Sequence, residues 1–253
     1  MDNEVQNIKR ACIQGYPVDL FDEKTGIQKI ENFIASSKTA QVITINPEMI
    51  ELAKKNTEFD KILKEAEIVI PDGIGVIIAL RIIGLKVKRL PGIEFSQKLF
   101  ELAQKKNYKV AFLGADTQTI EKAVFEVKKK HEKLNVVYVR NGYFNKDEEK
   151  LIVEDIKKAN PDLLFVGLGA PKQEFFISNY KNYLNRTIMV GVGGSFDVWS
   201  QKIKRAPLIF RKFGLEWFYR FITQPSRFNR IFPTLPLFLL KVIFNFRENR
   251  KEY

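Results

Sequence analysis

Residues 187–197 read TIMVGVGGSFD, an apolar, β-branched run that ends in glycines, a serine and an aspartate. The run 188–192 predicts a buried strand, and the glycines after it predict a tight turn into a helix. The same succession of apolar run, turn and amphipathic stretch recurs along the chain up to residue 193. Strands that alternate with helices predict an α/β fold, a Rossmann-like, mainly parallel sheet with helices on both faces.

The spacing of apolar residues places the expected elements. Strands are expected at 41–45, 68–70, 109–113, 136–139, 163–167 and 188–192. Helices are expected at 27–37, 48–65, 74–83, 94–106, 119–130, 146–158 and 173–184. Residues 1–197 are therefore assigned to an α/β core that carries any catalytic site.

The composition is that of a folded protein, with 45% hydrophobic and 28% charged residues in a chain of 253. Its single cysteine, Cys12, cannot form an internal disulfide. No N-terminal stretch combines basic residues with an apolar run. We therefore expect a cytoplasmic protein.

Residues 198–253 are predicted to form a basic, mostly helical appendage. Residues 201–253 hold twelve Lys or Arg against three Glu, a net charge of +9 within a total of +12. Interleaved aromatic residues suit an anionic membrane surface or nucleic acid, and the alternative is a cationic terminal helix packed on the core. A helix is expected at 208–223. The apolar run 236–244 is nine residues long, too short for a bilayer that needs roughly 20, but it could lie on a membrane.

Candidate binding residues follow the predicted strands, because parallel sheets bind ligands beyond the carboxyl ends of their strands. In GVGGSFD, 191–197, the backbone at Gly193, Gly194 and Ser195 can approach a phosphate or a nucleotide sugar, and Asp197 can accept hydrogen bonds from ribose. The spacing is not that of the dinucleotide fingerprint. The alternative is a tight turn that binds nothing.

A second glycine loop, GLGAPKQE, follows the strand before it. Gly167 and Gly169 lie in the same context as the later glycines, which favours one shared nucleotide site. Pro171 is expected to be the first residue of the next helix. Lys172 either contacts a phosphate or is simply solvated.

Polar residues also follow the first two predicted strands. Asp72 in PDGIG, 71–75, is either the N-cap of the next helix or a general base at the sheet edge. Thr44 and Asn46 in TINPEM, 44–49, could orient a substrate hydroxyl or a phosphate oxygen, and Asn46 could instead cap a helix.

The residues that the chain lacks narrow the chemistry. The lone histidine, His131, lies in the charged run KKKHEK, so zinc sites and Ser-His or Cys-His catalytic pairs are disfavoured. No D-x-D carboxylate pair is present to hold a metal on a nucleotide diphosphate. If phosphate leaves in the reaction, arginines and backbone dipoles must replace the metal, and no cofactor is expected.

The motifs TINPEM, PDGIG, GLGAPKQE, GVGGSFD, KRAP and GLEWFYRFITQPSR occur in this order across residues 16–235. Together they resemble the WecG/TagA/CpsF family of bacterial glycosyltransferases. The resemblance implies an inverting, metal-independent transfer of an N-acetylmannosamine-type sugar from a UDP donor. The acceptor would be a polyprenyl-diphosphate-linked N-acetylglucosamine at the cytoplasmic face of the membrane, for a teichoic acid or another surface polymer.

The same resemblance implies roles for single residues. Asp72 matches the proposed general base, Thr44 and Asn46 match polar residues of its pocket, and Arg89 matches an arginine near the reacting groups. Gln173 matches the glutamine near the donor, and the GVGGSFD loop matches the wall that holds the uridine. The basic residues thought to close over the site and meet the diphosphates are matched by Arg220, Arg227 and Arg230.

Two departures from the family pattern bear on these roles. Trp199, Ser200 and Gln201 stand where smaller residues are usual, and Gly92-Ile93-Glu94-Phe95 replaces the usual G-x-D-L. Two other functions stay open, a nicotinamide-dependent oxidoreductase and a nucleic-acid-binding protein that uses the basic appendage. We favour a transferase that binds no nucleic acid. Self-association into a homo-oligomer is left open.

Overall fold

The computed structural model describes residues 9–207, 210, 219 and 234–245. Its centre is a six-stranded sheet in which every neighbouring pair is parallel, in the order β4-β3-β8-β7-β5-β6. The predicted strands are all confirmed: β3 (Ala40–Ile45), β4 (Ile68–Pro71), β5 (Lys109–Gly114), β6 (Asn135–Arg140), β7 (Leu163–Gly167) and β8 (Ile188–Gly191).

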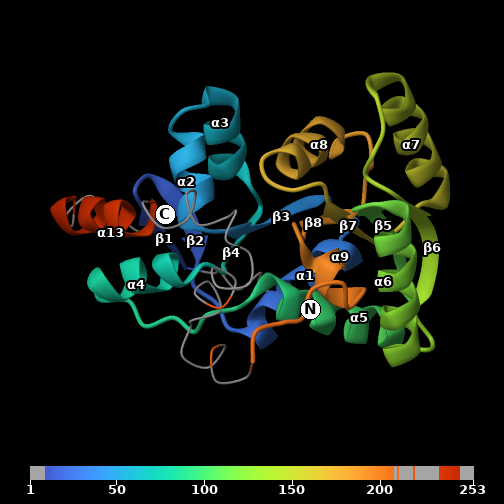
Figure 1. Ribbon diagram of the computed structural model, residues 1–253, viewed down its shortest axis with the longest axis horizontal. Coiled ribbons are helices and arrows are strands. Elements are labelled where there is room, and N and C mark those ends of the chain that lie inside the picture. The colour runs from blue at the N-terminus through green and yellow to red at the C-terminus, as the bar shows by residue number, and fades with distance from the viewer. Residues whose placement is uncertain (1–8, 208–209, 211–218, 220–233, 246–253) are drawn as a thin grey trace.

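Helices cover both faces of this sheet (Figure 1). One face carries α1 (Glu23–Ala35), α5 (Gly92–Lys106), α6 (Thr117–Lys130) and α9 (Ser195–Trp199). The other carries α2 (Pro47–Ala53), α3 (Thr57–Glu65), α7 (Lys146–Ala159) and α8 (Lys172–Tyr180). Successive strand residues bury on opposite faces, as with Val42 and Ile43, which explains why the strands are apolar without alternation.

Two helix predictions needed correction. The stretch expected to form one helix, 48–65, forms α2 and α3, because the Asn56 side chain accepts a hydrogen bond from Phe59 N at 2.9 Å and caps a new helix. Helix α8 ends at Tyr180, before the expected residue 184. The proline expected at its first position, Pro171, is instead its N-cap and follows a cis peptide bond.

A hairpin that the apolar pattern did not predict precedes the sheet. Strands β1 (Arg10–Ile13) and β2 (Tyr16–Asp19) pair antiparallel through a turn at Gln14 and Gly15, where φ is 53° and 88°. Positive φ at both central residues of a two-residue turn suits the twist of a hairpin. Only the glycine signals it in the sequence.

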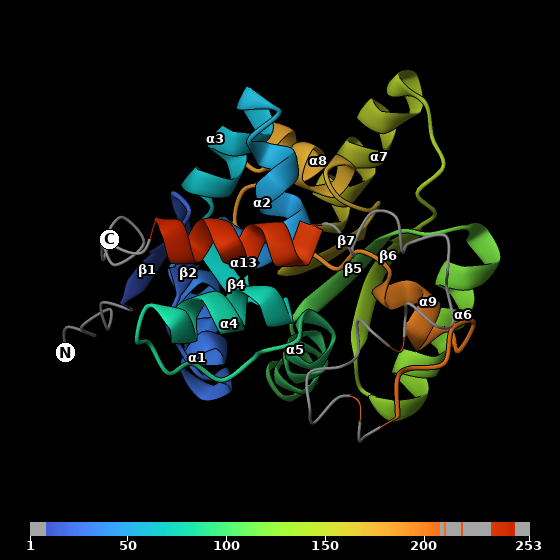
Figure 2. The ribbon, with the colours of Figure 1, turned by 60° about the vertical axis from the view of Figure 1, so that its left-hand side comes forward.

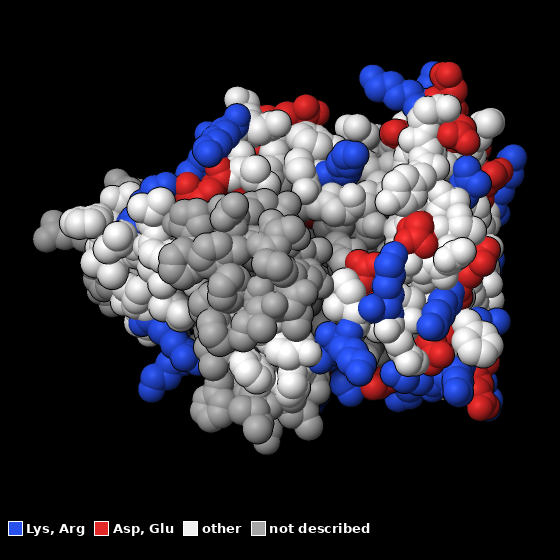
Figure 3. Space-filling model, in the orientation of Figure 1, with Lys and Arg blue, Asp and Glu red and all other residues white. Residues whose placement is uncertain are grey.

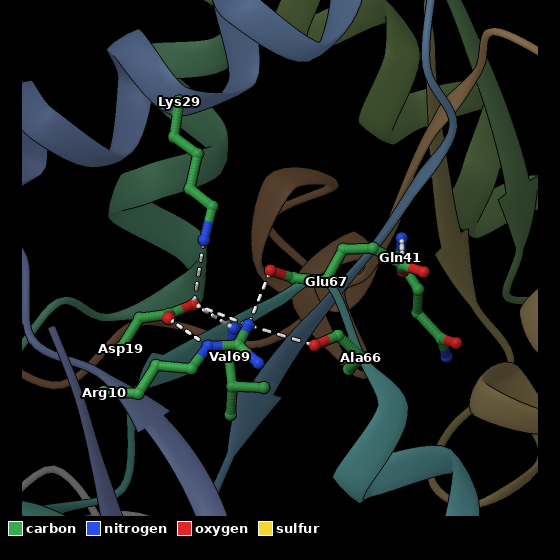
Figure 4. A network of polar contacts seen from close by, with 7 residues as sticks. All are labelled: Arg10, Asp19, Lys29, Gln41, Ala66, Glu67 and Val69. Atoms are coloured by element: carbon green, nitrogen blue, oxygen red, sulfur yellow. Dashed lines mark hydrogen bonds and ion pairs between the residues drawn. The ribbon is translucent and has the colours of Figure 1, made fainter. Parts of the chain in front are cut away.

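The hairpin is fixed to edge strand β4 by buried charge (Figure 4). Asp19 is fully buried, accepts from Arg10 Nε at 2.6 Å and from Val69 N at 2.8 Å, and pairs with Lys29 at 3.6 Å. Arg10 also donates to the carbonyl oxygens of Ala66 and Glu67, at 3.0 and 2.6 Å. One N–H of the edge strand and two carbonyl oxygens just before it are thereby paired within the molecule rather than left open to another chain.

Helix α13 (Thr234–Phe244) packs on the core beside α4 (Ile74–Ile82) and α2 (Figure 2). It buries Phe238 and Val242 and exposes Leu237, Leu240 and Ile243. The apolar run 236–244 therefore lies on the protein with one face and in solvent with the other. No helix among the described residues is long and apolar enough to cross a bilayer. The predicted helix 208–223 falls almost wholly outside the described residues.

Candidate active site

The site lies where two neighbouring strands send their connections to opposite faces of the sheet. Strand β3 leads into α2 on one face, whereas its neighbour β8 leads into α9 on the other. Loops that diverge in this way leave a crevice at the carboxyl ends of the strands. A cavity of about 510 Å³ occupies this point.

Most of the predicted site residues line this one cavity, although they come from four separate strand ends. They are Thr44, Asn46, Asp72, Arg89, Gly169, Gln173, Gly193, Gly194 and Ser195. The lining also includes the first residues of α4 and α5 and the second residue of α8. Helix N-termini carry positive dipole ends, so this part of the wall favours an anionic ligand.

Asp72 follows β4 and presents a carboxylate to the cavity. It is not a helix cap, since Gly73 is the N-cap of α4 and no side chain caps that helix. Arg89 Nε donates to the Asp72 carbonyl oxygen at 2.7 Å, and Arg89 Nη2 lies 3.4 Å from Asp72 Oδ1. The side chain of Asp72 is 32% exposed, so solvent or a substrate hydroxyl can reach it.

Asn46 and Thr44 form the wall beside Asp72. Asn46 is a helix cap as well as a lining residue, because its Oδ1 accepts from Met49 N at 3.1 Å. The first residue of α5, Gly92, packs directly against Thr44. A Cβ added at Gly92 would lie 2.6 Å from Thr44 Cγ2, so only glycine allows this close approach. Gly92 therefore admits the start of α5 to the cavity wall.

Gly193, Gly194 and Ser195 form one wall of the cavity, here called the Gly193 wall. Its backbone differs in one respect from the ligand-binding role expected from the sequence. The Gly193 N–H donates to Gln173 Oε1 at 2.9 Å, so in this structure it meets a side chain where a ligand phosphate or nucleotide sugar was expected. Its φ of +50° requires a left-handed backbone, and a Cβ there would meet nothing within 4 Å. Backbone conformation thus explains this glycine, while the space beside it belongs to the cavity.

Three predicted residues lie outside the cavity lining: Gly167, Lys172 and Asp197. Gly167 has a packing role, since a Cβ there would lie 2.4 Å from Phe196 Cδ2, and its absence lets α9 approach β7. Lys172 is exposed to solvent at the start of α8. Arg220, Arg227 and Arg230 lie outside the described residues.

The sequence reasoning missed two lining residues that come from the C-terminal part of the chain. Thr234 and Leu235, at the start of α13, line the cavity beside the α4 N-terminus. A Cβ at Gly75 would lie 2.5 Å from Leu235 Cδ1 and 2.6 Å from Pro47 Cγ. Gly75 is the sequence signal for this contact, but its partner lies 160 positions away and no spacing rule points to it.

Behind the Gly193 wall lies a buried acid, Glu174, which is 1% exposed. Its Oε1 accepts from Gln173 Nε2 at 2.7 Å, and its Oε2 has no hydrogen-bond partner among the described residues. Burial raises the pKa of Glu174 to about 7, against the lowering effect of the hydrogen bond from Gln173.

This raised pKa makes the stability of the fold depend on pH. Below the unfolded-state pKa of 4.5 the carboxyl is neutral in both states, and between 4.5 and about 7 folding requires a proton that the unfolded chain has lost. We expect Glu174→Gln to gain about 3 kcal/mol in free energy of unfolding, relative to the wild type, between pH 4.5 and pH 8. Urea unfolding at both pH values measures this. A gain no larger than that of exposed Glu65→Gln would show that Glu174 titrates normally.

No group of three or more His, Cys, Asp or Glu side chains that could hold a metal ion occurs in the described part of the chain. Arg89 is the cationic side chain in the lining of the described cavity, and the helix N-termini add partial positive charge. A phosphorylated ligand would be held by these groups.

A parallel, Rossmann-like sheet with a cavity at a topological switch point is typical of α/β proteins that bind a ligand at the carboxyl ends of their strands. The whole chain specifies more. Residues 11–252 match the Glycosyl transferase WecG/TagA/CpsF family, and the protein belongs to this family of glycosyltransferases.

Relatives named N-acetylglucosaminyldiphosphoundecaprenol N-acetyl-beta-D-mannosaminyltransferase are similar over most of the chain. The one from Bacillus spizizenii strain W23 is 34% identical over 222 residues, which is 87% of this chain and 85% of the relative. The one from Staphylococcus aureus strain NCTC 8325 is 34% identical over 228 residues, which is 88% of this chain and 89% of the relative.

Proposed function

We propose that the protein transfers an N-acetylmannosamine-type sugar from a UDP donor to a polyprenyl-diphosphate-linked N-acetylglucosamine, inverting the anomeric centre without a metal. The names of the relatives supply the transferred sugar and the acceptor. The observation that carries the proposal is that one cavity is lined by the Asp72 carboxylate and by the glycine walls at Gly169 and Gly193. A base and a nucleotide wall in the same cavity are what a single-displacement transfer requires.

In the proposed mechanism the Asp72 carboxylate takes the proton of the acceptor hydroxyl. The hydroxyl oxygen bonds to the anomeric carbon as the bond from that carbon to the diphosphate oxygen breaks, and UDP leaves from the opposite face. One displacement inverts the centre. Arg89, whose Nη2 lies 3.4 Å from Asp72 Oδ1, and the N-termini of α4, α5 and α8 stabilise the charge that develops on the diphosphate.

The remaining residues are assigned by their place in the cavity. Gly169, Gln173, Gly193, Gly194 and Ser195 hold the donor, and Thr44 and Asn46 orient the acceptor. Lys172, Asp197 and Gly167 stay candidates for the outer part of the donor site. The arginines of the appendage, Arg220, Arg227 and Arg230, are proposed to meet the diphosphates.

The proposal is tested by incubating the protein with a panel of UDP sugars and a polyprenyl-diphosphate N-acetylglucosamine, with mass spectrometry of the lipid product. We expect one added N-acetylhexosamine with the N-acetylmannosamine donor. Titration with NADH serves as the comparison for an oxidoreductase. Tight NADH binding without any response to UDP would replace the transferase by that alternative.

Turnover is expected to continue in EDTA, because the sequence has no D-x-D pair and the proposal gives the diphosphate to arginines and helix termini. Initial rates with 5 to 10 mM EDTA should stay within about twofold of those with added Mg²⁺, the range left by ionic effects. Activity that vanishes in EDTA and returns with Mg²⁺ or Mn²⁺ would refute the metal-independent mechanism.

We also propose that the appendage holds the protein on the inner face of the cell membrane, where the lipid-linked acceptor lies. Eight of the twelve basic residues of 201–253 fall outside the described residues. On the described surface in Figure 3, Lys and Arg are interspersed with acidic side chains. The excess positive charge therefore comes mainly from the appendage, and each such residue near an anionic leaflet contributes about 1 kcal/mol.

Reversing three of these charges, Arg247→Glu, Arg250→Glu and Lys251→Glu together, is expected to lower binding to vesicles of anionic lipid at least tenfold, since roughly 3 kcal/mol of attraction is lost. The matched control reverses Lys128, Lys129 and Lys130 at the end of α6 and should bind nearly as the wild type. Co-sedimentation with vesicles reads both variants. RNA binding that the appendage variant loses, with vesicle binding unchanged, would favour the nucleic-acid alternative.

A further inference from the structure

The wall that faces the proposed donor is held from behind by a chain of buried amide and acid groups. Gln173 is 4% exposed, and its two amide atoms have different partners: Oε1 accepts from Gly193 N at 2.9 Å and Nε2 donates to Glu174 Oε1 at 2.7 Å. The orientation of this amide is therefore fixed from both ends. An acceptor at position 174 binds Nε2 and so helps to keep Oε1 turned toward the Gly193 N–H.

The surroundings of Glu174 are shaped to hold this pair. A Cβ added at Gly191 would lie 2.8 Å from Gln173 Nε2 and 3.3 Å from Glu174 Oε1, so the strand leaves room for both side chains. Gln41 on β3, 1% exposed, donates from Nε2 to the Glu174 carbonyl oxygen at 3.3 Å and ties the first turn of α8 to the sheet. No salt bridge to Glu174 occurs among the described residues.

We propose that Glu174 is a positioning residue for the donor: its carboxyl orients the Gln173 amide, which in turn holds the Gly193 backbone in the shape that the nucleotide meets. Glu174 itself does not line the cavity. The inference rests on the proposed function, because it takes UDP as the ligand of the Gly193 wall. It assigns to the acid a task separate from proton transfer.

The cost of losing the carboxyl follows from this geometry. With an apolar side chain at position 174, Gln173 Nε2 would stay buried without a partner. Rotation of the Gln173 amide would give Nε2 a new position, but Nε2 would then face the Gly193 N–H. Both groups are hydrogen-bond donors, so the present hydrogen bond would be lost. The first outcome removes one of the two contacts that fix the amide, and the second breaks the hydrogen bond to Gly193. In both cases the Gly193 loop is held less firmly, so donor binding weakens while the base at Asp72 is untouched.

The test compares UDP affinity, by calorimetry, in Glu174→Met and Glu174→Gln. Met is apolar and of similar length, whereas Gln retains an acceptor oxygen. We expect Met to weaken UDP binding at least tenfold and to raise KM for the donor far more than it lowers kcat, and Gln to stay within threefold of the wild type. Equal affinity in Met and wild type, or a tenfold loss in Gln, would overturn the proposal.

Two controls separate positioning from general loosening. Thr187→Val also removes a buried side-chain hydrogen bond, from Thr187 Oγ1 to the Pro161 carbonyl oxygen at 2.9 Å, but at the amino end of β8. It should leave UDP affinity unchanged. In a Gln173→Met background, adding Glu174→Met should change UDP affinity by less than twofold, because the acid acts through the amide. If the two substitutions lowered UDP affinity additively, Glu174 would not act through the Gln173 amide.

A measurement on the free protein covers the case in which Glu174→Met does not fold or the wild type does not bind UDP. The amide proton of Gly193 should exchange slowly by NMR in the wild type and in Glu174→Gln, since Gln173 Oε1 accepts it. Exchange in the wild type as fast as that of an open loop would overturn the positioning role. Absence of UDP binding with a protected Gly193 amide would instead refute the proposed function alone.

Discussion

Asp72→Asn is expected to lower turnover by about 10²–10⁴-fold, the usual contribution of a general base. Asparagine has nearly the same shape and can keep the contact with Arg89, but its amide cannot take the proton of the attacking hydroxyl. The loss should appear in kcat, while the affinity for UDP changes little, because the carboxylate acts on the acceptor. Steady-state kinetics with the lipid acceptor, together with UDP calorimetry, measure both.

Asp155→Asn is the matched control for this substitution. Asp155 lies on α7, its side chain is 56% exposed, and it forms an ion pair across the helix surface with Lys158 at 3.5 Å. Its kinetics should match the wild type. Full turnover in Asp72→Asn would remove Asp72 from the role of base, and an equal loss of UDP affinity would place it on the donor side instead.

Asp19→Ala is expected to lower the free energy of unfolding by about 3–5 kcal/mol, the range found when one partner of a buried ion pair is removed. The substitution leaves the Val69 N–H and Arg10 Nε without the carboxylate that accepts from them. Burial already lowers the pKa of Lys29, and the Asp19 charge is the main group that offsets this effect. Urea unfolding, followed by circular dichroism, gives the change.

The comparison for this prediction is Asp155→Ala on the exposed surface, which should change stability by less than about 0.5 kcal/mol. Asp19→Asn, which keeps an acceptor for Val69 N, should fall between the two. If Asp19→Ala were as stable as Asp155→Ala, the hairpin would not be fixed to β4 by this carboxylate.

The strands of the sheet were predictable from the sequence because both of their faces are buried. Runs such as 163–167 carry apolar residues at every position, and the structure confirms them. The hairpin β1–β2 was not predicted, since its strands have four residues each and its turn is Gln-Gly rather than a common hairpin pair. The break between α2 and α3 carried a signal at Asn56 that apolar periodicity alone does not register.

The site was predictable in part for a related reason. Residues such as Asp72 and Gly193 directly follow strands, and parallel strands bring their carboxyl ends to one edge whatever the details of packing. Contacts that depend on side-chain geometry were not predictable. Leu235 reaches the cavity from the far end of the chain, and the Gly193 N–H was expected to meet a ligand, whereas it donates to Gln173.

The central claim is that the Asp72 carboxylate and the glycine walls enclose one donor and one acceptor in the same cavity. A crystal structure with UDP bound tests it most directly. We predict the nucleotide against Gly169 and Gly193, with its β-phosphate toward Arg89 and the cavity beside Asp72 left open for the acceptor. UDP bound at another part of the molecule, or with its uracil covering Asp72, would contradict the account.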